Sequence, residues 1–158
     1  MADIVFNIAK GRVVEYYNRV ENNDPATSAI IVIPVLTAGL ETDAVLIDKD
    51  DLAAVFTGAT DEATAGGWNR KTLTDVDLAA LPAPDDTNDR YEVDIPDQTW
   101  TAVAAGNNTS KLIIAYDADT GAGTDANIIP LTMHDFAVTT DGSNVTAQIA
   151  ATGFFRAT

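Results

Sequence analysis

Ala29-Ile-Ile-Val-Ile-Pro-Val-Leu36 is the longest apolar run in the chain, and it decides the fold class. Its β-branched residues favour a strand that is buried on both faces. Pro34 cannot donate a ladder hydrogen bond, which predicts a sheet edge or a bulge late in this strand. The run is far too short to span a bilayer. It therefore predicts a core strand of a soluble domain.

Further strand patterns lie on both sides of this run. Arg90-Tyr-Glu-Val-Asp-Ile-Pro-Asp97 alternates between apolar and charged residues, which is typical of a strand with one buried face. The remaining predicted strands cover residues 3–9, 69–78, 100–103, 111–116, 128–138 and 145–149. Many short strands with turn residues between them predict a mainly β fold, sandwich or barrel-like.

Two of these strand segments carry more specific predictions. Leu73 and Val76 are the expected inward residues of the strand that contains them. Asp141-Gly142 is the strongest hairpin signal in the chain. It predicts that the strand at 128–138 turns back and pairs with the strand at 145–149.

Two segments favour short helices within the β fold. In the first, apolar side chains follow the i, i+3, i+4, i+7 spacing of an amphipathic helix at Val13, Tyr16, Tyr17 and Val20. Because β-branched and aromatic residues also suit a strand, both structures stay open, and we favour a helix ended by Asn22-Asn-Asp-Pro25. Asp50-Asp-Leu-Ala-Ala-Val-Phe56 has an Asp cap before an apolar stripe and predicts the second helix.

The length of 158 residues fits a single domain spanning 1–158. Within it, Leu81-Pro-Ala-Pro-Asp-Asp-Thr-Asn-Asp89 is rich in Pro and Asp. This segment is either a linker between two halves of the domain or an exposed arm. Residues 1–25 are a candidate anchoring arm.

The charge of the chain restricts its partners. Nine Lys and Arg face 24 Asp and Glu, which gives a formal net charge of −15. Such a surface repels phosphate backbones and anionic lipids, so we expect neither a nucleic-acid nor a membrane partner. Solubility is the simplest explanation of the charge, and recruitment of divalent cations between copies is the alternative.

The residues that usually carry catalysis are sparse. The chain has no cysteine, and its only histidine, His134, is followed by Asp135. A single His beside an Asp more often makes hydrogen bonds at a turn or at the edge of the core than it acts as a base. We therefore predict no catalytic residues and no enzyme.

Metal, cofactor and sugar sites are also disfavoured. Asp117-Ala-Asp-Thr-Gly-Ala-Gly-Thr-Asp125 begins like a calcium loop but lacks the later ligands of an EF-hand, so we expect a solvated turn. The same holds for the acidic segments 48–51 and 85–89. Trp68 and Trp100 could stack on sugars, although a core or interface role is more common for Trp. No metal and no cofactor are predicted.

A resemblance carries the interpretation further than these patterns do. Three segments are similar to small virion structural proteins of tailed bacteriophages. They are Ile4-Val-Phe-Asn-Ile-Ala-Lys-Gly-Arg-Val-Val-Glu-Tyr-Tyr-Asn-Arg-Val20 with Asn23-Asp-Pro-Ala26, Leu73 to Tyr91, and Ile129 to Gly142. The likeness spans nearly the whole chain but includes no site chemistry. It implies a virion component made in the host cytoplasm, and no signal peptide is visible at the N-terminus.

Within the virion, the expected role is that of a capsid decoration or cement protein on the outer head surface. Its partners would be the major capsid protein and further copies of itself, in a rotational homo-oligomer such as a trimer. Candidate interface residues are apolar or aromatic side chains near the N-terminus, namely Ile4, Val5, Phe6, Tyr16 and Tyr17. Exposed strand edges could also pair between subunits.

Two alternatives remain at this point. A neck, tail or head-fibre protein of the same virion would have a similar sequence. A small calcium- or sugar-binding module belongs to a different class and would depend on Asp117 and Asp119.

Overall fold

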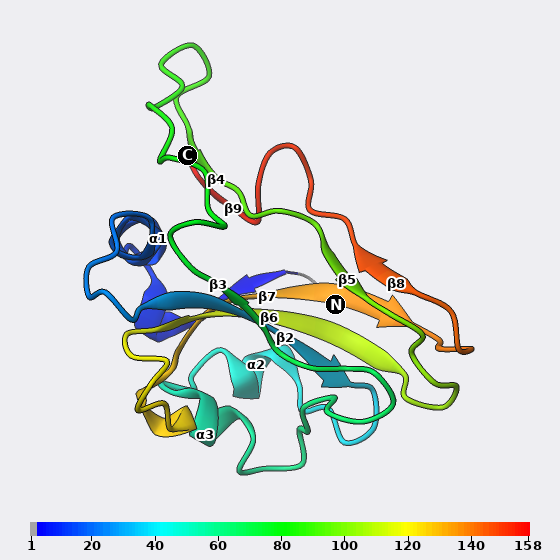
Figure 1. Cartoon of the computed structure of the whole chain (residues 1–158). Coiled ribbons are helices and arrows are strands. Elements are labelled where there is room, and N and C mark those ends of the chain that lie inside the picture. Colours follow the sequence, from blue (N-terminus) through cyan, green and yellow to red (C-terminus); the bar gives the residue numbers. More distant parts are fainter. Residues whose placement is uncertain (1–2) are drawn as a thin grey trace.

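The computed structural model describes residues 3–158, which fold into a layered β structure (Figure 1). Its helices are α1 (Val13–Glu21), α2 (Asp43–Leu46) and α3 (Leu52–Val55), with the 3-10 turns η1 (Asn7–Ala9) and η2 (Asp125–Asn127). Its strands are β1 (Ile4–Val5), β2 (Ala29–Leu36), β3 (Lys71–Leu73), β4 (Tyr91–Val93), β5 (Gln98–Trp100), β6 (Thr109–Asp117), β7 (Ile129–Val138), β8 (Val145–Ala147) and β9 (Phe155–Ala157). Within the described residues, no helix is long and apolar enough to cross a membrane.

The core is built on an open five-stranded sheet in the order β1-β7-β6-β2-β3. Each neighbouring pair in this sheet is antiparallel. The long strands β2, β6 and β7 lie side by side in its centre, and the short strands β1 and β3 form its edges. Two smaller ribbons, β4-β9 and β5-β8, complete the strand content.

The apolar run at 29–36 is explained by its place in this sheet. Ile30 and Val32 face one hydrophobic cluster, whereas Ile31 and Ile33 face a second cluster on the opposite side. A strand with two buried faces needs apolar residues at every position. Each fully buried Ile or Val side chain contributes about 1.5–3 kcal/mol to the free energy of unfolding, so this strand holds the two clusters together.

Pro34 confirms the predicted irregularity late in the strand. β3 pairs with β2 only from Ile30 to Val32, and farther along the same side Val35 forms an isolated bridge with Glu62. The register against β6 then shifts between Val35 and Leu36. The missing N–H of proline is tolerated because Pro34 lies in the gap between the pairing with β3 and the bridge at Val35.

One face of the sheet is covered by α1 together with the two ribbons (Figure 1). The predicted stripe of α1 is buried at all four positions, which confirms the helix. Tyr16 stacks on Tyr116 of β6 with ring centroids 4.6 Å apart. Packing of the stripe against the sheet stabilises this nine-residue helix, which would be marginal on its own.

The opposite face of the sheet is covered by α2 and α3 (Figure 1). The carboxylate of Asp51 accepts a hydrogen bond from the Ala54 backbone N–H at 2.7 Å, so the predicted Asp cap starts α3. Leu52 and Val55 point into the core from this helix. The mainly β fold with short helices is therefore confirmed, and it is layered rather than closed into a barrel.

The predicted hairpin at Asp141-Gly142 is wrong in its partner. Gly142 does adopt a positive φ of 100°, as a turn there requires. However, its N–H donates to Val103 O at 2.8 Å, and this attachment carries the chain away from β7. β8 then pairs with β5 instead.

Several predicted strands are shorter than expected, including those at 90–97 and 145–149, which are confined to β4 and β8. The strand at 69–78 ends after Leu73, because the Asp77 carboxylate accepts hydrogen bonds from the N–H and hydroxyl of Thr74 and forms a turn. Leu73 is buried as predicted, whereas Val76 is 84% exposed and was wrongly assigned inward. The strand at 3–9 is confined to β1, after which η1 begins.

Candidate interaction site

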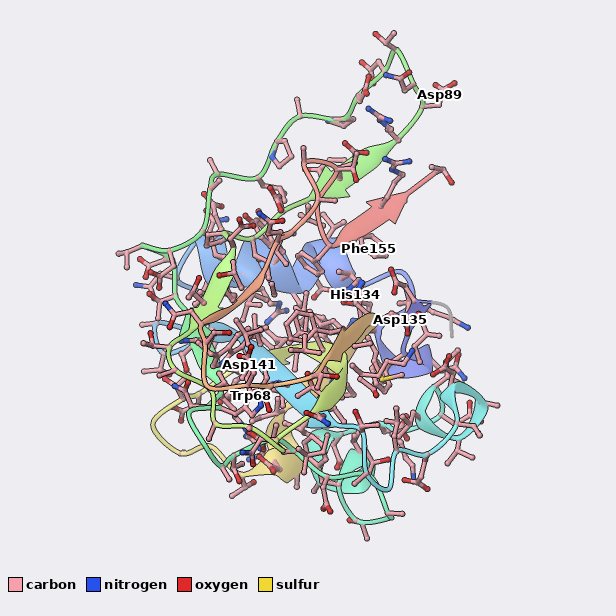
Figure 2. All side chains as sticks on the ribbon, turned by 90° about the vertical axis from the view of Figure 1, so that its right-hand side faces the viewer. Trp68, Asp89, His134, Asp135, Asp141 and Phe155 are labelled. Atoms are coloured by element: carbon pink, nitrogen blue, oxygen red, sulfur yellow. The ribbon has the colours of Figure 1, made fainter. Side chains whose placement is uncertain are left out.

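A projecting arm is the most prominent surface feature of the molecule. The arm comprises residues 82–90 and extends from the ribbon β4-β9, beyond the layered body (Figure 1). Asp89 lies near its tip (Figure 2). Of the two possibilities for the Pro- and Asp-rich segment, the structure therefore shows the exposed arm.

Hydrogen bonds within the arm keep it ordered without a core of its own. Asp85 and Arg90 are joined by two backbone hydrogen bonds of 2.9 and 3.2 Å. The Asp85 carboxylate also accepts bonds from the N–H groups of Thr87 and Asn88 and from Arg90 Nε. The hydrogen bond from the Asn88 side chain and the neighbouring Arg90 together hold the pKa of Asp85 below its usual value.

The base of the arm is fastened to the ribbon. The Tyr91 hydroxyl donates to the Pro82 carbonyl across the two sides of the arm. In the ribbon, Glu92 lies opposite Arg156 and accepts a hydrogen bond from it at 2.7 Å. Pro82 and Pro84 also restrict the unfolded chain. The arm is therefore preorganised, which lowers the entropic cost of docking.

The tip of the arm is anionic. Asp86 and Asp89 are exposed, and no ion pair of theirs is found within residues 3–158. The arm contains no nucleophile paired with a base. Its chemistry therefore suits recognition of a complementary surface.

A cavity of about 380 Å³ lies at the base of the arm. Its walls combine small apolar residues from 79–83 with three carboxylates, Asp85 in the arm and Glu92 and Asp94 just after it. Ala151 and Gly153 of the C-terminal segment also line it. Tyr17 reaches it from α1 and donates a hydrogen bond to Ala79 O at 2.9 Å. Burial raises the pKa of this tyrosine.

A second cavity, of about 240 Å³, contains His134 on its wall. Its imidazole lies between Asp3 and Thr132: Nδ1 is 3.3 Å from the Asp3 carboxylate, and Nε2 is 2.9 Å from the Thr132 hydroxyl. The order acid, imidazole, hydroxyl resembles that of a hydrolytic triad. Thr132 is only 1% exposed, however, so its hydroxyl has no access for a substrate. No local sequence pattern indicates that Asp3 and Thr132 flank this histidine.

The five candidate interface residues are not on a free surface. Phe6, Tyr16 and Tyr17 are buried in the core, and Ile4 and Val5 are half-buried where β1 pairs with β7. The N-terminal anchoring arm is thus corrected for residues 3–25, which belong to the body of the domain; residues 1–2 lie outside the described residues. Aromatic side chains at helical spacing fill the core in preference to solvent.

The acidic loop 117–127 uses its carboxylates for local structure. Asp117 accepts a hydrogen bond from the N–H of Asp119, and Asp119 accepts one from the N–H of Gly121, each at 3.0 Å. Asp125 is paired with Arg70 at 2.6 Å. Across residues 3–158, no group of three or more His, Asp or Glu side chains is placed to hold a metal ion.

Trp68 and Trp100 pack in the core. Their rings meet edge to face at 5.0 Å, and each indole N–H donates to a backbone carbonyl, of Asn107 and Asn69 respectively. Both residues are buried, so neither offers a stacking platform to a sugar. This is the more common of the two roles considered for them.

Comparisons with protein-family models, with curated proteins and with solved structures gave no match.

Proposed function

We propose that this chain is a structural protein of a bacteriophage virion, and specifically a decoration protein on the outer surface of the head. The observation that carries the proposal is the preorganised arm, residues 82–90, which projects from a body with two buried sheet faces. The resemblance of three sequence segments to small virion proteins supports it. The net charge of −15 favours a position outside the shell, away from the genome.

The arm acts as the docking element in this proposal. A rigid projection can contact a neighbouring capsomer while the body rests on another, and such bridging stabilises a shell. Its partners are the major capsid protein and further copies of the chain, in a rotational oligomer such as a trimer. When many weak contacts act together on one lattice, the overall attachment is much stronger than any single contact.

Binding to shells tests this role of the arm. Purified chain is mixed with capsids that lack it, and bound protein is measured by cosedimentation. Replacing residues 83–89 with a short Gly-Ser turn removes the projection while the core stays intact. We expect the thermal midpoint to change by less than about 2 °C, because the arm contributes no buried core residue, and capsid binding to be lost.

A charge-matched pair of variants sharpens this test. Asp86→Asn with Asp89→Asn neutralises the tip, whereas Asp50→Asn with Asp61→Asn makes the same charge change at exposed sites in the body. The tip variant should bind more weakly than the body variant. Equal binding by both, together with full binding by the shortened arm, would contradict the proposed docking role.

A neck, tail or head-fibre location is the alternative within the same particle. The two locations differ in copy number, because the symmetry of each part of the particle sets how many copies it holds. We expect hundreds of copies of a decoration protein and about a dozen of a neck or tail protein. Mass spectrometry of purified virions, calibrated against the major shell protein, measures this number. Absence of the chain from mature particles would overturn both locations.

A further inference from the structure

The cavity at the base of the arm is unusual because of what lines it. Half of the residues that line it have short apolar side chains, namely Ala79, Ala80, Pro82, Ala83 and Ala151. These leave about 380 Å³ that no side chain of the protein fills. The cavity is open to solvent, and its methyl-lined walls are suited to an inserted aliphatic side chain.

Three carboxylates line the same cavity, and they differ in how they are paired. Asp85 and Glu92 already form ion pairs, with Arg90 at 3.0 Å and with Arg156 at 2.7 Å. Asp94 accepts a hydrogen bond from the adjacent N–H of Ile95 at 2.8 Å, but no Lys or Arg within residues 3–158 forms an ion pair with it. The cavity therefore has one carboxylate that a cation from outside could pair with.

The electrostatic surroundings of Asp94 point the same way. Partial burial raises the pKa of Asp94, and the neighbouring Asp97 raises it further. A cation held at Asp94 would favour the charged carboxylate and so lower its pKa against both effects.

We propose that this cavity binds a lysine side chain presented by a protein partner. The aliphatic stem of lysine would pack against the alanines and Pro82, and its ammonium group would pair with Asp94. Lysine is the occupant that this arrangement favours, because one oxygen of Asp94 already accepts the Ile95 N–H and a compact ammonium group needs only the other oxygen. A chain of net charge −15 also favours a basic partner surface over a second copy of itself.

This inference rests on the proposed function for the identity of the partner, which would be the basic patch of a shell protein. The pocket itself can be tested without particles. The probe is the blocked peptide acetyl-Gly-Lys-Gly-amide, titrated into the isotope-labelled full chain while backbone amide shifts are recorded. The matched control probe replaces lysine with norleucine, which keeps the stem and removes the charge.

Saturable shifts are expected at residues 79–83, at Asp94 and at 151–153 with the lysine peptide, and much weaker ones with the norleucine peptide. Asp94→Asn should weaken binding about fivefold, as for loss of one partly exposed ion pair. Ala83→Leu, which fills the cavity without changing charge, should also weaken it. Asp50→Asn, an exposed carboxylate elsewhere on the molecule, should leave the affinity unchanged.

Absence of saturable shifts at these residues, or equal loss of affinity in Asp94→Asn and Asp50→Asn, would overturn the pocket. Equal affinity for the two peptides would overturn the role of the charge. If the lysine peptide binds as expected but the chain does not attach to capsids, the pocket stands and the virion role fails. The two proposals are therefore distinguished by the same set of variants.

Discussion

Lys111 is the residue whose surroundings differ most from what its sequence context indicates. It precedes the apolar part of β6, and its side chain is completely buried. The ammonium group lies 2.6 Å from an oxygen of Asp135 on β7 and 3.2 Å from one of Asp43 on α2. The Asp43 oxygen is itself buried and makes no hydrogen bond of good geometry, so this ionic contact stabilises it. The pairs join three elements at one point.

Removing the lysine should destabilise the fold strongly. Lys111→Ala leaves a cavity and a buried carboxylate oxygen without its cation, and breaking a buried pair in this way costs about 3–5 kcal/mol. Urea unfolding followed by circular dichroism measures the loss. Lys10→Ala, at an exposed position, should change the free energy of unfolding by less than about 0.5 kcal/mol. Similar stabilities for both variants would contradict the role assigned to the buried pairs.

The same contact predicts an acid dependence of stability. The hydrogen bond from Lys111 lowers the pKa of Asp135 relative to its value in the unfolded chain. A carboxylate with a lowered folded-state pKa contributes stability that is fully present above the unfolded value, about 3.9, and is lost as pH falls through the folded value.

The stability difference between the native chain and Asp135→Asn should therefore be constant near neutral pH and shrink below about pH 4. Urea midpoints measured at a series of pH values report it. Asp50→Asn, at an exposed site, serves as the control for a general effect of charge. A difference that stays constant into strong acid would show that Asp135 does not titrate with the fold.

At the scale of elements, Arg70 fastens loops to the sheet. It lies just before β3, donates three hydrogen bonds to Glu62 on one side, and donates two more to Asp125 at the start of η2. The hydrogen bonds that Arg70 donates to Asp125 and Glu62 raise its pKa further above the usual value. Planar, bidentate pairing of this kind requires arginine.

Arg70→Lys should therefore be more than a conservative change. Lysine keeps the charge but cannot contact both carboxylates with paired N–H groups. We expect the free energy of unfolding to fall by about 1–2 kcal/mol. This is less than for a fully buried pair, because the site is partly open to solvent. Faster amide hydrogen exchange in 118–127 should accompany it. Arg12→Lys, at an exposed pair with Glu15, should be nearly neutral in both measurements.

At the scale of the whole molecule, the net charge of −15 acts against compactness. Within residues 3–158, most of the 24 acidic side chains form no ion pair with a Lys or Arg, of which the chain has nine. Mutual repulsion of surface charges destabilises a folded protein and is screened by salt. The two buried cores supply the compensating free energy.

Stability should consequently rise with ionic strength. The thermal midpoint is expected to increase as sodium chloride is raised from about 10 mM to about 150 mM, where the screening length falls from about 30 to 8 Å. A variant with four exposed Asp residues changed to Asn, at positions 50, 61, 86 and 89, should show a smaller increase. A flat or falling midpoint in the native chain would mean that repulsion is not a significant term.

The elements that could be predicted from the sequence are those governed by local pattern. The continuous apolar run at 29–36 determined a doubly buried strand, and the spacing in 13–20 determined a helix, because burial follows the period of each backbone. Asp51 starts α3 by bonding an N–H three residues away, a contact that is complete within its own segment. Composition likewise determined the mainly β class.

Only the tertiary structure decided which distant segments meet. Gly142 forms a turn as its sequence requires, yet its attachment to Val103 gives β8 the partner β5 in place of β7. Tyrosines at positions 16 and 17 are compatible with either an interface or the core, and residue type does not decide between them. Packing of α1 on the sheet places both side chains in the core. The cavity beside Asp94 and the burial of Lys111 also arise from segments far apart in sequence. Local periodicity specifies which face of an element is apolar, but the choice among competing apolar faces is made by the packing of the whole chain.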